Sequence, residues 1–372
     1  MSKKILYIAN VDWFFISHRL NLAEEATSRG YEVHIATQIT SHYESLLKRG
    51  FHIHRLSYKR SKSLLSITKE IYSFFQMIKL FITIKPDIVH LISLKPALYG
   101  GLLSILFKKP KIILSVTGTG FLFNSSGFFG KVFEKLVVYL FSIILKQKQV
   151  EAIFQNKENI TYFKQRGVKF FKSPNLIKGS GVDIKKFTYS TEPSGQFTVM
   201  MISRLLKDKG VYEFVEASKI LSANRINVRM ILVGEIDENP MSITRKEVEK
   251  WVEDEILEWW GHRKDIYEVM KKSNVICLPS YHEGFPKVLM EAAASARAVI
   301  TTDVAGCRDA IIQNVTGILV KKYSSNEIVD AICFLKENEK IRKKMGEEGR
   351  KLAVKKFDIN LVTKKHFEIY QK

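Results

Sequence analysis

Two glutamates carry the most distinctive chemistry in the sequence. Glu283 and Glu291 lie in the segment SYHEGFPKVLMEAAA, directly after the apolar run 275–278. If that run is a strand and a helix begins near Phe285, Glu283 lies on the connecting loop and Glu291 on the helix. The free N–H groups at such a helix start suit a diphosphate. The loop carboxylate can accept hydrogen bonds from sugar hydroxyls and Glu291 can bind a ribose. The alternative is a glutamate favoured by the helix dipole followed by a solvated one.

A basic turn supplies a second set of candidate ligands. The segment ISRLLKDKG places Arg204, Lys209 and Gly210 directly after an apolar run and before a helical pattern. Two cations on such a turn can neutralise a diphosphate and stabilise its charge as it departs. Gly210 permits a tight entry into the helix. The alternative is a solvated basic turn in a lysine-rich chain.

Together these two segments resemble a known family. The patterns R-x4-K-G, from Arg204 to Gly210, and E-G-F-P-x4-E-A, from Glu283 to Ala292, are similar to the retaining, nucleotide-sugar-dependent glycosyltransferases of the GT-B fold. Three further segments support the likeness: GSGVDIKKF, LVGEIDENP and WWGHRKDI. The last two, with VDWFFISHR near the start, resemble the branch that builds bacterial surface polysaccharides on polyprenyl diphosphate carriers.

The resemblance implies a role for each matching residue. Arg204 and Lys209 would bind the diphosphate, Glu283 the transferred sugar and Glu291 the ribose. Backbone N–H groups are expected from Gly284, Phe285 and Pro286. With these three included, the residues expected to contact the donor besides the four above are Gly284, Phe285, Pro286, Lys287, Val288, His262 and Arg263.

The resemblance also implies a donor, an acceptor and a stereochemical course. The donor would be a UDP-activated N-acetylhexosamine and the acceptor a polyprenyl-diphosphate-linked saccharide. The anomeric configuration would be retained, through an oxocarbenium-like sugar. No metal or other cofactor is expected, since no D-x-D-like motif flanks the site.

Two segments depart from the family pattern. Many relatives carry a Gly-Gly pair where this chain has NVDWFFISHR, so His18 or Arg19 is a candidate contact for the acceptor's phosphates. The alternative for His18 is a capping or helix-surface histidine. A histidine of many relatives is replaced by the run Thr117, Gly118, Thr119 and Gly120. This run is either a close backbone approach to the acceptor or only a tight turn.

The strand pattern predicts two doubly wound parallel α/β units, facing each other across a cleft. Runs rich in β-branched residues alternate with helical patterns, which favours parallel sheets covered by helices. The expected strands are residues 4–9, 32–37, 52–56, 87–92, 111–116 and 152–156, then 197–202, 228–233, 256–260, 275–278, 298–302 and 317–320.

The domain organisation follows from a break in this alternation. Residues 178–196 are rich in Gly, Ser and Pro, which is typical of a linker. We expect an acceptor-binding, membrane-facing domain over 1–180 and a nucleotide-sugar domain over 181–355. The segment 356–372 is expected to return to the first domain as a helix, with a hinge near 179–187.

The charge distribution points to an anionic partner. The net charge is +21, and residues 1–180 hold 27 Lys and Arg against 10 Asp and Glu. The segments 59–85 and 128–148 combine aromatic, aliphatic and lysine residues, so they could lie on an anionic membrane surface or simply pack on the sheet. No apolar run is long enough to span a bilayer. No signal peptide is expected, and three cysteines without C-x-x-C spacing suit a reducing compartment.

These features predict a cytoplasmic enzyme on the inner face of the cell membrane. A nucleic-acid-binding protein is disfavoured because no zinc spacing, aromatic RNA-binding motif or basic recognition helix is present. Two alternatives stay open. One is a nucleotide-sugar epimerase or hydrolase on the same scaffold, and the other is a non-catalytic membrane-bound protein.

Overall fold

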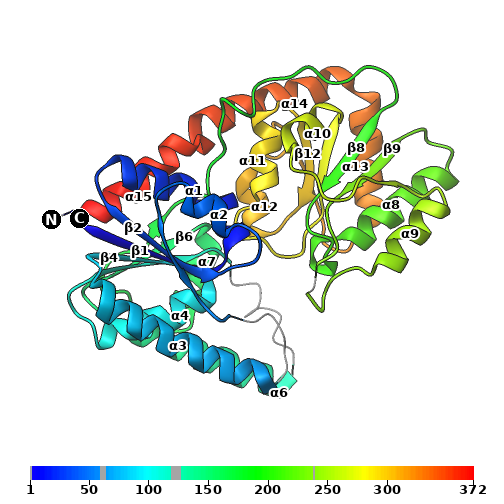
Figure 1. The fold of residues 1–372 in the computed structure, drawn as a ribbon. Coiled ribbons are helices and arrows are strands. Elements are labelled where there is room, and N and C mark those ends of the chain that lie inside the picture. The colour runs from blue at the N-terminus through cyan, green and yellow to red at the C-terminus, as the bar shows by residue number, and fades with distance from the viewer. Residues whose placement is uncertain (1, 59–63, 119–126, 238) are drawn as a thin grey trace. The chain divides into compact units, whose positions relative to one another are not determined.

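The chain forms two compact units. The structure is a computed structural model that describes residues 2–58, 64–118, 127–237 and 239–372. One unit comprises Met1–Ser180 and Val362–Lys372, and the other comprises Gly181–Leu361. Each unit contains one parallel sheet with helices on both faces (Figure 1).

The sheet of the first unit has the strand order β3-β2-β1-β4-β5-β6-β7, and all pairs are parallel. Its strands are β1 (Lys4–Val11), β2 (Glu32–Gln38), β3 (His52–Arg55), β4 (Ile88–Ile92), β5 (Lys111–Val116), β6 (Val150–Phe154) and β7 (Asn175–Leu176). Its helices are α1 (Asp12–Ser28), α2 (Tyr43–Leu47), α3 (Leu64–Ile84), α4 (Leu94–Leu102), α6 (Gly127–Ile144), α7 (Lys157–Gln165) and most of α15 (Ile359–Gln371).

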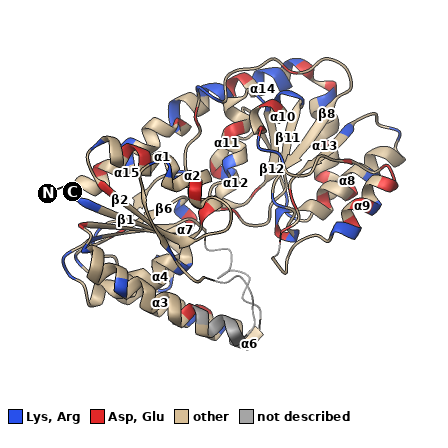
Figure 2. Ribbon diagram, viewed as in Figure 1, with Lys and Arg blue, Asp and Glu red and all other residues tan. Residues whose placement is uncertain are grey.

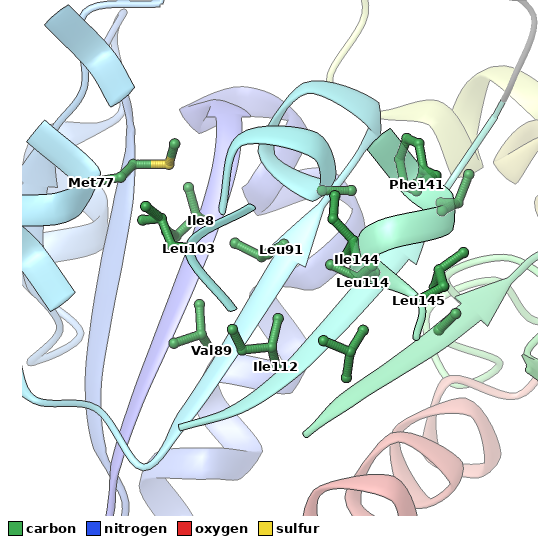
Figure 3. Close-up of a cluster of buried hydrophobic side chains, with 14 of the residues drawn as sticks. Ile8, Met77, Val89, Leu91, Leu103, Ile112, Leu114, Phe141, Ile144 and Leu145 are labelled. Atoms are coloured by element: carbon green, nitrogen blue, oxygen red, sulfur yellow. The ribbon is translucent and has the colours of Figure 1, made fainter. Parts of the chain in front are cut away.

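Alternating side chains of these strands build two cores. Leu6, Ile8 and Leu91 pack with α3, α4 and α6 on one face of the sheet. Figure 3 shows Ile8 and Leu91 of this core together with Met77 of α3 and Phe141 of α6. Ile5 and Tyr7 face the opposite way and pack with α1 and α15. Because both faces are covered, the strands are continuous apolar runs, as expected for buried parallel strands.

The second unit repeats this plan with the strand order β10-β9-β8-β11-β12-β13. Its strands are β8 (Thr198–Ile202), β9 (Arg229–Val233), β10 (Glu258–Trp259), β11 (Val275–Leu278), β12 (Ala298–Thr302) and β13 (Gly317–Val320). Its helices are α8 (Val211–Ala223), α9 (Arg245–Glu253), α10 (Ile266–Lys271), α11 (Lys287–Ala294), α12 (Ala305–Ala310), α13 (Ser325–Glu337) and α14 (Glu339–Leu352).

The doubly wound α/β architecture is therefore confirmed in both units, with local differences. Strand β6 begins and ends two residues earlier than expected, and β10 is shorter than the expected strand. The short strand β7 was not expected, because two residues show no alternation. Among the described residues, no helix combines the length and apolar character needed to cross a membrane.

Candidate functional site

The candidate donor residues of the second unit gather at the carboxyl edge of its sheet. Strands β8 and β11 are neighbours, and the chain winds away from them in opposite directions. This is the topological switch point, where open α/β sheets bind their ligands. Arg204 and Lys209 follow β8, while Glu283 follows β11. The topology thus brings the two predicted motifs to the same place.

A close backbone contact joins these two loops. Gly210 has a φ of +77°, and a Cβ atom there would lie 2.1 Å from the carbonyl oxygen of Pro279. The N–H of Tyr281 donates a hydrogen bond of 2.8 Å to the carbonyl of Asp208. Only glycine fits this combination of positive φ and close approach. Gly210 therefore sets Lys209 beside the loop that carries Glu283.

Lys209 and Glu283 form an ion pair at the centre of this site. Lys209 Nζ donates to Glu283 Oε1 over 2.6 Å, and Ser280 Oγ donates to the same oxygen over 2.9 Å. The two charged side chains are only 15% and 13% exposed. Glycine is also required on the other side of the loop, because a Cβ at Gly306 would lie 2.7 Å from the Glu283 carbonyl oxygen.

Arg204 lies at the same edge but has a different partner. Its Nη1 donates to Asp237 Oδ2 over 3.2 Å, and its side chain is 44% exposed. Asp237 follows β9, the other neighbour of β8. Asp237 and Ser280 were not named as site residues, although Asp237 lies in the quoted segment LVGEIDENP and Ser280 begins the segment that carries Glu283. The Arg204–Asp237 contact depends on strand order, whereas Ser280 and Glu283 are three residues apart on one loop.

Helix α11 begins at Lys287, two residues after the expected start at Phe285. Pro286 is its N-cap, and no side chain caps this end by a hydrogen bond. The expectation that Pro286 presents an N–H group was wrong, because proline has no amide hydrogen. Lys287 and Val288 instead form the first turn of α11, where backbone amides point out of the helix end. Phe285 is buried, and its ring packs edge-on against Phe357.

Glu291 lies on the same helix, four residues after Lys287. Lys287 Nζ is 3.4 Å from Glu291 Oε1, and Glu291 is buried. Burial raises the pKa of Glu291 above its ordinary value, and the ammonium of Lys287 opposes that shift. Glu291 is therefore a desolvated carboxylate with the Lys287 ammonium beside it, and not a solvated helix residue.

His262 and Arg263 lie further along the same edge, after the outer strand β10. His262 Nδ1 is 3.7 Å from a carboxylate oxygen of Glu235, and both side chains are exposed. Arg263 binds the carboxylate of Asp265, with 2.8 Å from its Nε to Oδ1. None of these contacts joins them to the Lys209–Glu283 pair.

The candidate acceptor residues in the first unit have different surroundings. His18 is half-buried and stacks on Phe14 with ring centroids 4.3 Å apart. Arg19 is buried, and its Nη1 donates to the carbonyl of His18 over 2.8 Å. Thr117 and Gly118 are half-buried directly after β5. Thr119 lies outside the described residues.

The burial of Arg19 differs from the expected contact with a phosphate. Its Nε has no hydrogen-bond partner within the described part of the chain. Burial lowers the pKa of Arg19 to about 10, while the nearby tyrosines 370 and 7 oppose the shift. The structure thus places Arg19 in the core under α15 rather than at a surface.

Comparisons with known proteins identify the family of each unit. Residues 4–153 match the family described as Glycosyl transferase 4-like, and residues 183–352 match Glycosyl transferases group 1. The N,N'-diacetylbacillosaminyl-diphospho-undecaprenol alpha-1,3-N-acetylgalactosaminyltransferase of Campylobacter jejuni is 25% identical, over 96% of this chain and 98% of its own length. The capsular polysaccharide biosynthesis glycosyltransferase CapM of Staphylococcus aureus is 28% identical, over 83% of this chain and 82% of its own.

A solved structure supports the fold. Anabaena HepE in complex with UDP matches with a TM-score of 0.79 at 16% identity, covering 99% of each chain. The two family matches together span most of the sequence and coincide with the two parallel-sheet units. The first domain therefore belongs to the Glycosyl transferase 4-like family and the second to the Glycosyl transferases group 1 family, and together they have the GT-B fold.

Proposed function

We propose that this glycosyltransferase moves a sugar from a UDP-sugar onto a polyprenyl-diphosphate-linked saccharide, with retention of the anomeric configuration. The Lys209–Glu283 pair beside the start of α11 is the observation that carries the proposal. This arrangement combines a cation and the positive end of the helix dipole for a diphosphate with a carboxylate for sugar hydroxyls. Glu291 would bind the ribose.

The chemistry follows from where charge develops. As the glycosidic bond to the diphosphate breaks, negative charge grows on the leaving oxygens. Lys209, Arg204 and the first amides of α11 stabilise that charge, each in a fixed position before the reaction. The acceptor hydroxyl attacks from the face that the leaving group vacates, and its proton passes to the oxygen of the departing diphosphate as the new glycosidic bond forms. This scheme requires no metal.

The names of relatives support the choice of substrates. The C. jejuni relative is named for transfer of N-acetylgalactosamine to an undecaprenol-diphosphate-linked sugar. An Escherichia coli relative, 24% identical over 79% of this chain, is named for transfer from UDP-Gal to a GlcNAc-diphosphoundecaprenol. We propose a UDP-N-acetylhexosamine donor for this chain, in the assembly of a bacterial surface polysaccharide.

Transfer of labelled sugar tests the proposal. UDP- and GDP-sugars are offered with polyprenyl-diphosphate sugars in detergent, to the native chain and to Glu283→Ala and Arg204→Ala. We expect transfer from a UDP-N-acetylhexosamine by the native chain and a large loss in both variants. Arg229→Ala is a matched control, because Arg229 pairs with Glu258 and begins β9 at the opposite edge of the sheet. Equal transfer by all variants would contradict the site assignment.

An acceptor-free assay separates the rival reactions. An epimerase or hydrolase converts the nucleotide sugar without a lipid acceptor, whereas the proposed enzyme leaves the donor intact until the acceptor is added. Rapid donor turnover in detergent alone would favour the rival. A non-catalytic protein would show no turnover under either condition.

An exposed apolar face in the first unit supports peripheral attachment to the cytoplasmic side of the membrane. Helix α3 exposes Tyr72, Phe75 and Ile82, and α6 exposes Leu136 and Tyr139. Both helices pack with α4 on the same face of the sheet. Lys79, Lys131 and Lys135 are exposed on these helices, whose charges are shown in Figure 2. Such faces bind anionic bilayers through apolar insertion and lysine attraction.

Vesicle flotation tests this attachment. We expect binding to vesicles rich in anionic lipid, weaker binding to zwitterionic vesicles, and loss of binding in Tyr72→Ser/Phe75→Ser. Tyr189→Ser is the control, because Tyr189 is similarly exposed but lies in the second unit. Equal binding by both variants would contradict the assignment. Salt-dependent binding to plain DNA, unaffected by nucleotide sugars, would instead favour a nucleic-acid partner.

A further inference from the structure

The two groups proposed to hold the diphosphate and the sugar of the donor are bound to each other in this structure. Lys209 Nζ lies 2.6 Å from Glu283 Oε1, with Ser280 Oγ on the same oxygen. Both charged side chains are largely shielded from water. A ligand that takes Lys209 away therefore leaves Glu283 as a desolvated carboxylate with one hydroxyl donor, which is a costly state.

We propose that the Lys209–Glu283 pair makes the site discriminate between the intact nucleotide sugar and the nucleoside diphosphate that remains after transfer. This inference rests on the proposed function. The intact donor attracts Lys209 with its phosphates and offers sugar hydroxyls that donate to Glu283. UDP attracts Lys209 but has no sugar to offer, so Glu283 loses its cation without a replacement. The pair therefore weakens product binding specifically.

The surrounding backbone supports an exchange of side-chain partners rather than a shift of loops. Gly210 packs against the carbonyl of Pro279, and Gly306 packs against the carbonyls of Glu283 and Gly284. Tyr281 adds a backbone hydrogen bond to Asp208. The two loops are thus held together independently of the ion pair. Rotation of the Lys209 and Glu283 side chains is the simplest way to open it.

Calorimetric binding of UDP and of UDP-N-acetylgalactosamine or UDP-N-acetylglucosamine, without acceptor, tests the proposal. Glu283→Gln keeps the shape of the side chain but removes the negative charge that holds Lys209. We expect this variant to bind UDP about tenfold more tightly than the native chain, since the pair no longer has to be broken. Its affinity for the UDP-sugar should stay unchanged or fall. The native preference for the sugar nucleotide would then be lost or reversed.

A double-mutant cycle separates pair opening from simple repulsion between Glu283 and phosphate. In a Lys209→Met background, Glu283→Gln should change UDP affinity by less than about twofold, because no pair remains to open. A gain in UDP affinity that persists in the Lys209→Met background would mean that Glu283 only repels the phosphates of UDP. That result would overturn the proposal. No gain in the native background would overturn it as well, because Lys209 would then serve both partners at once.

Two controls protect the interpretation. Lys207→Met removes a lysine of the same turn whose ammonium lies over Tyr212, so Glu283→Gln should keep its full effect there. Lys209→Arg keeps a cation and should retain the preference for the sugar nucleotide. Thermal unfolding of each variant checks that the fold is intact. If the native chain binds neither UDP nor a UDP-sugar, the proposed function itself fails, which differs from equal affinities for both ligands.

Discussion

Arg19, inside α1, and Lys209, in the turn before α8, are basic residues that follow the first strand of their units, yet their surroundings are opposite. Each follows a strand next to a switch point, β1 in one sheet and β8 in the other. Arg19 is 2% exposed, and no carboxylate pairs with it among the described residues. Lys209 lies at the sheet edge and is paired with Glu283. The first environment suits a structural cation, whereas the second suits exchange with a ligand.

The cluster around Arg19 fastens α15 to the first sheet. The Tyr370 hydroxyl and His90 Nδ1 share a hydrogen bond of 2.6 Å, and His90 Nε2 contacts Ser115 Oγ at 2.6 Å. His366 Nδ1 donates to the carbonyl of Val362. All these side chains are buried. Substitutions here should therefore change stability, whereas substitutions at the edge of the second sheet should change transfer.

The largest effect is expected at Lys209. Lys209→Met removes a fixed cation from the leaving diphosphate, so kcat should fall about 10²- to 10³-fold. The free energy of unfolding should also fall, by ~1–3 kcal/mol, because Glu283 is left shielded from water without its cation. Steady-state transfer assays and urea denaturation measure the two quantities. A variant that unfolds readily but transfers normally when folded would erase the contrast with Arg19.

Arg19 should show the reverse pattern. Arg19→Ala leaves a cavity under α15 and should lower the free energy of unfolding by ~2–4 kcal/mol. Arg19→Met fills most of that space without a buried charge, so its stability should stay within ~1 kcal/mol of native. Both variants should keep kcat when folded. A stable Arg19→Met protein that has lost transfer would show that Arg19 contacts the acceptor after all.

Much of the fold could be predicted because buried parallel strands are short, continuous apolar runs. The two-residue strands β7 and β10 could not be bounded, since two residues carry no period. The start of α11 was misplaced because a proline fits both the N-cap and the first turn. The residues of each motif are close together in the sequence and follow a strand. The placement of the strands was therefore enough to predict that both motifs lie at the carboxyl edge of the sheet.

Contacts across strands were harder to predict. The pairing of Arg204 with Asp237 requires that β9 lie beside β8, and sequence alone gives no strand order. The inward direction of Arg19 was hidden because helix α1 packs polar and apolar residues alike against its neighbours. Spacing therefore indicated which residues lie at the site, and topology decided which of them meet.

Acid should weaken the first unit through its buried histidines. Burial holds the pKa of His90 well below its usual value and lowers that of His366 to about 3. The unfolded chain binds these protons near pH 6.5, whereas the folded chain does not. Stability is therefore fully present above pH 6.5 and is lost as the pH falls, by about 1.4 kcal/mol per pH unit for each histidine.

Urea denaturation between pH 6.5 and 5 measures this slope, above the range in which most carboxylates titrate. His366→Leu should reduce it by about one proton. His54 lies outside the cluster and offers an independent second case, because burial and neighbouring histidines lower its pKa to about 4. His54→Asn should reduce the slope by up to the same amount, and the two effects should add. An unchanged slope in His366→Leu would mean that His366 is not held neutral in the folded state.

The smallest effect is expected at the edge of the same cluster, where Asn21 Nδ2 donates to Thr363 Oγ1 over 2.7 Å. Asn21→Ala should lower the free energy of unfolding by ~0.5–1.5 kcal/mol, the usual net value of one hydrogen bond. Combined with Thr363→Val, it should show a coupling close to that single-variant cost. Transfer by Asn21→Ala should match the native chain. A loss of transfer together with full coupling would mean that the anchoring of α15 also supports catalysis. The cluster in the first unit would then be both structural and functional, in contrast to the separation of roles proposed for the two units.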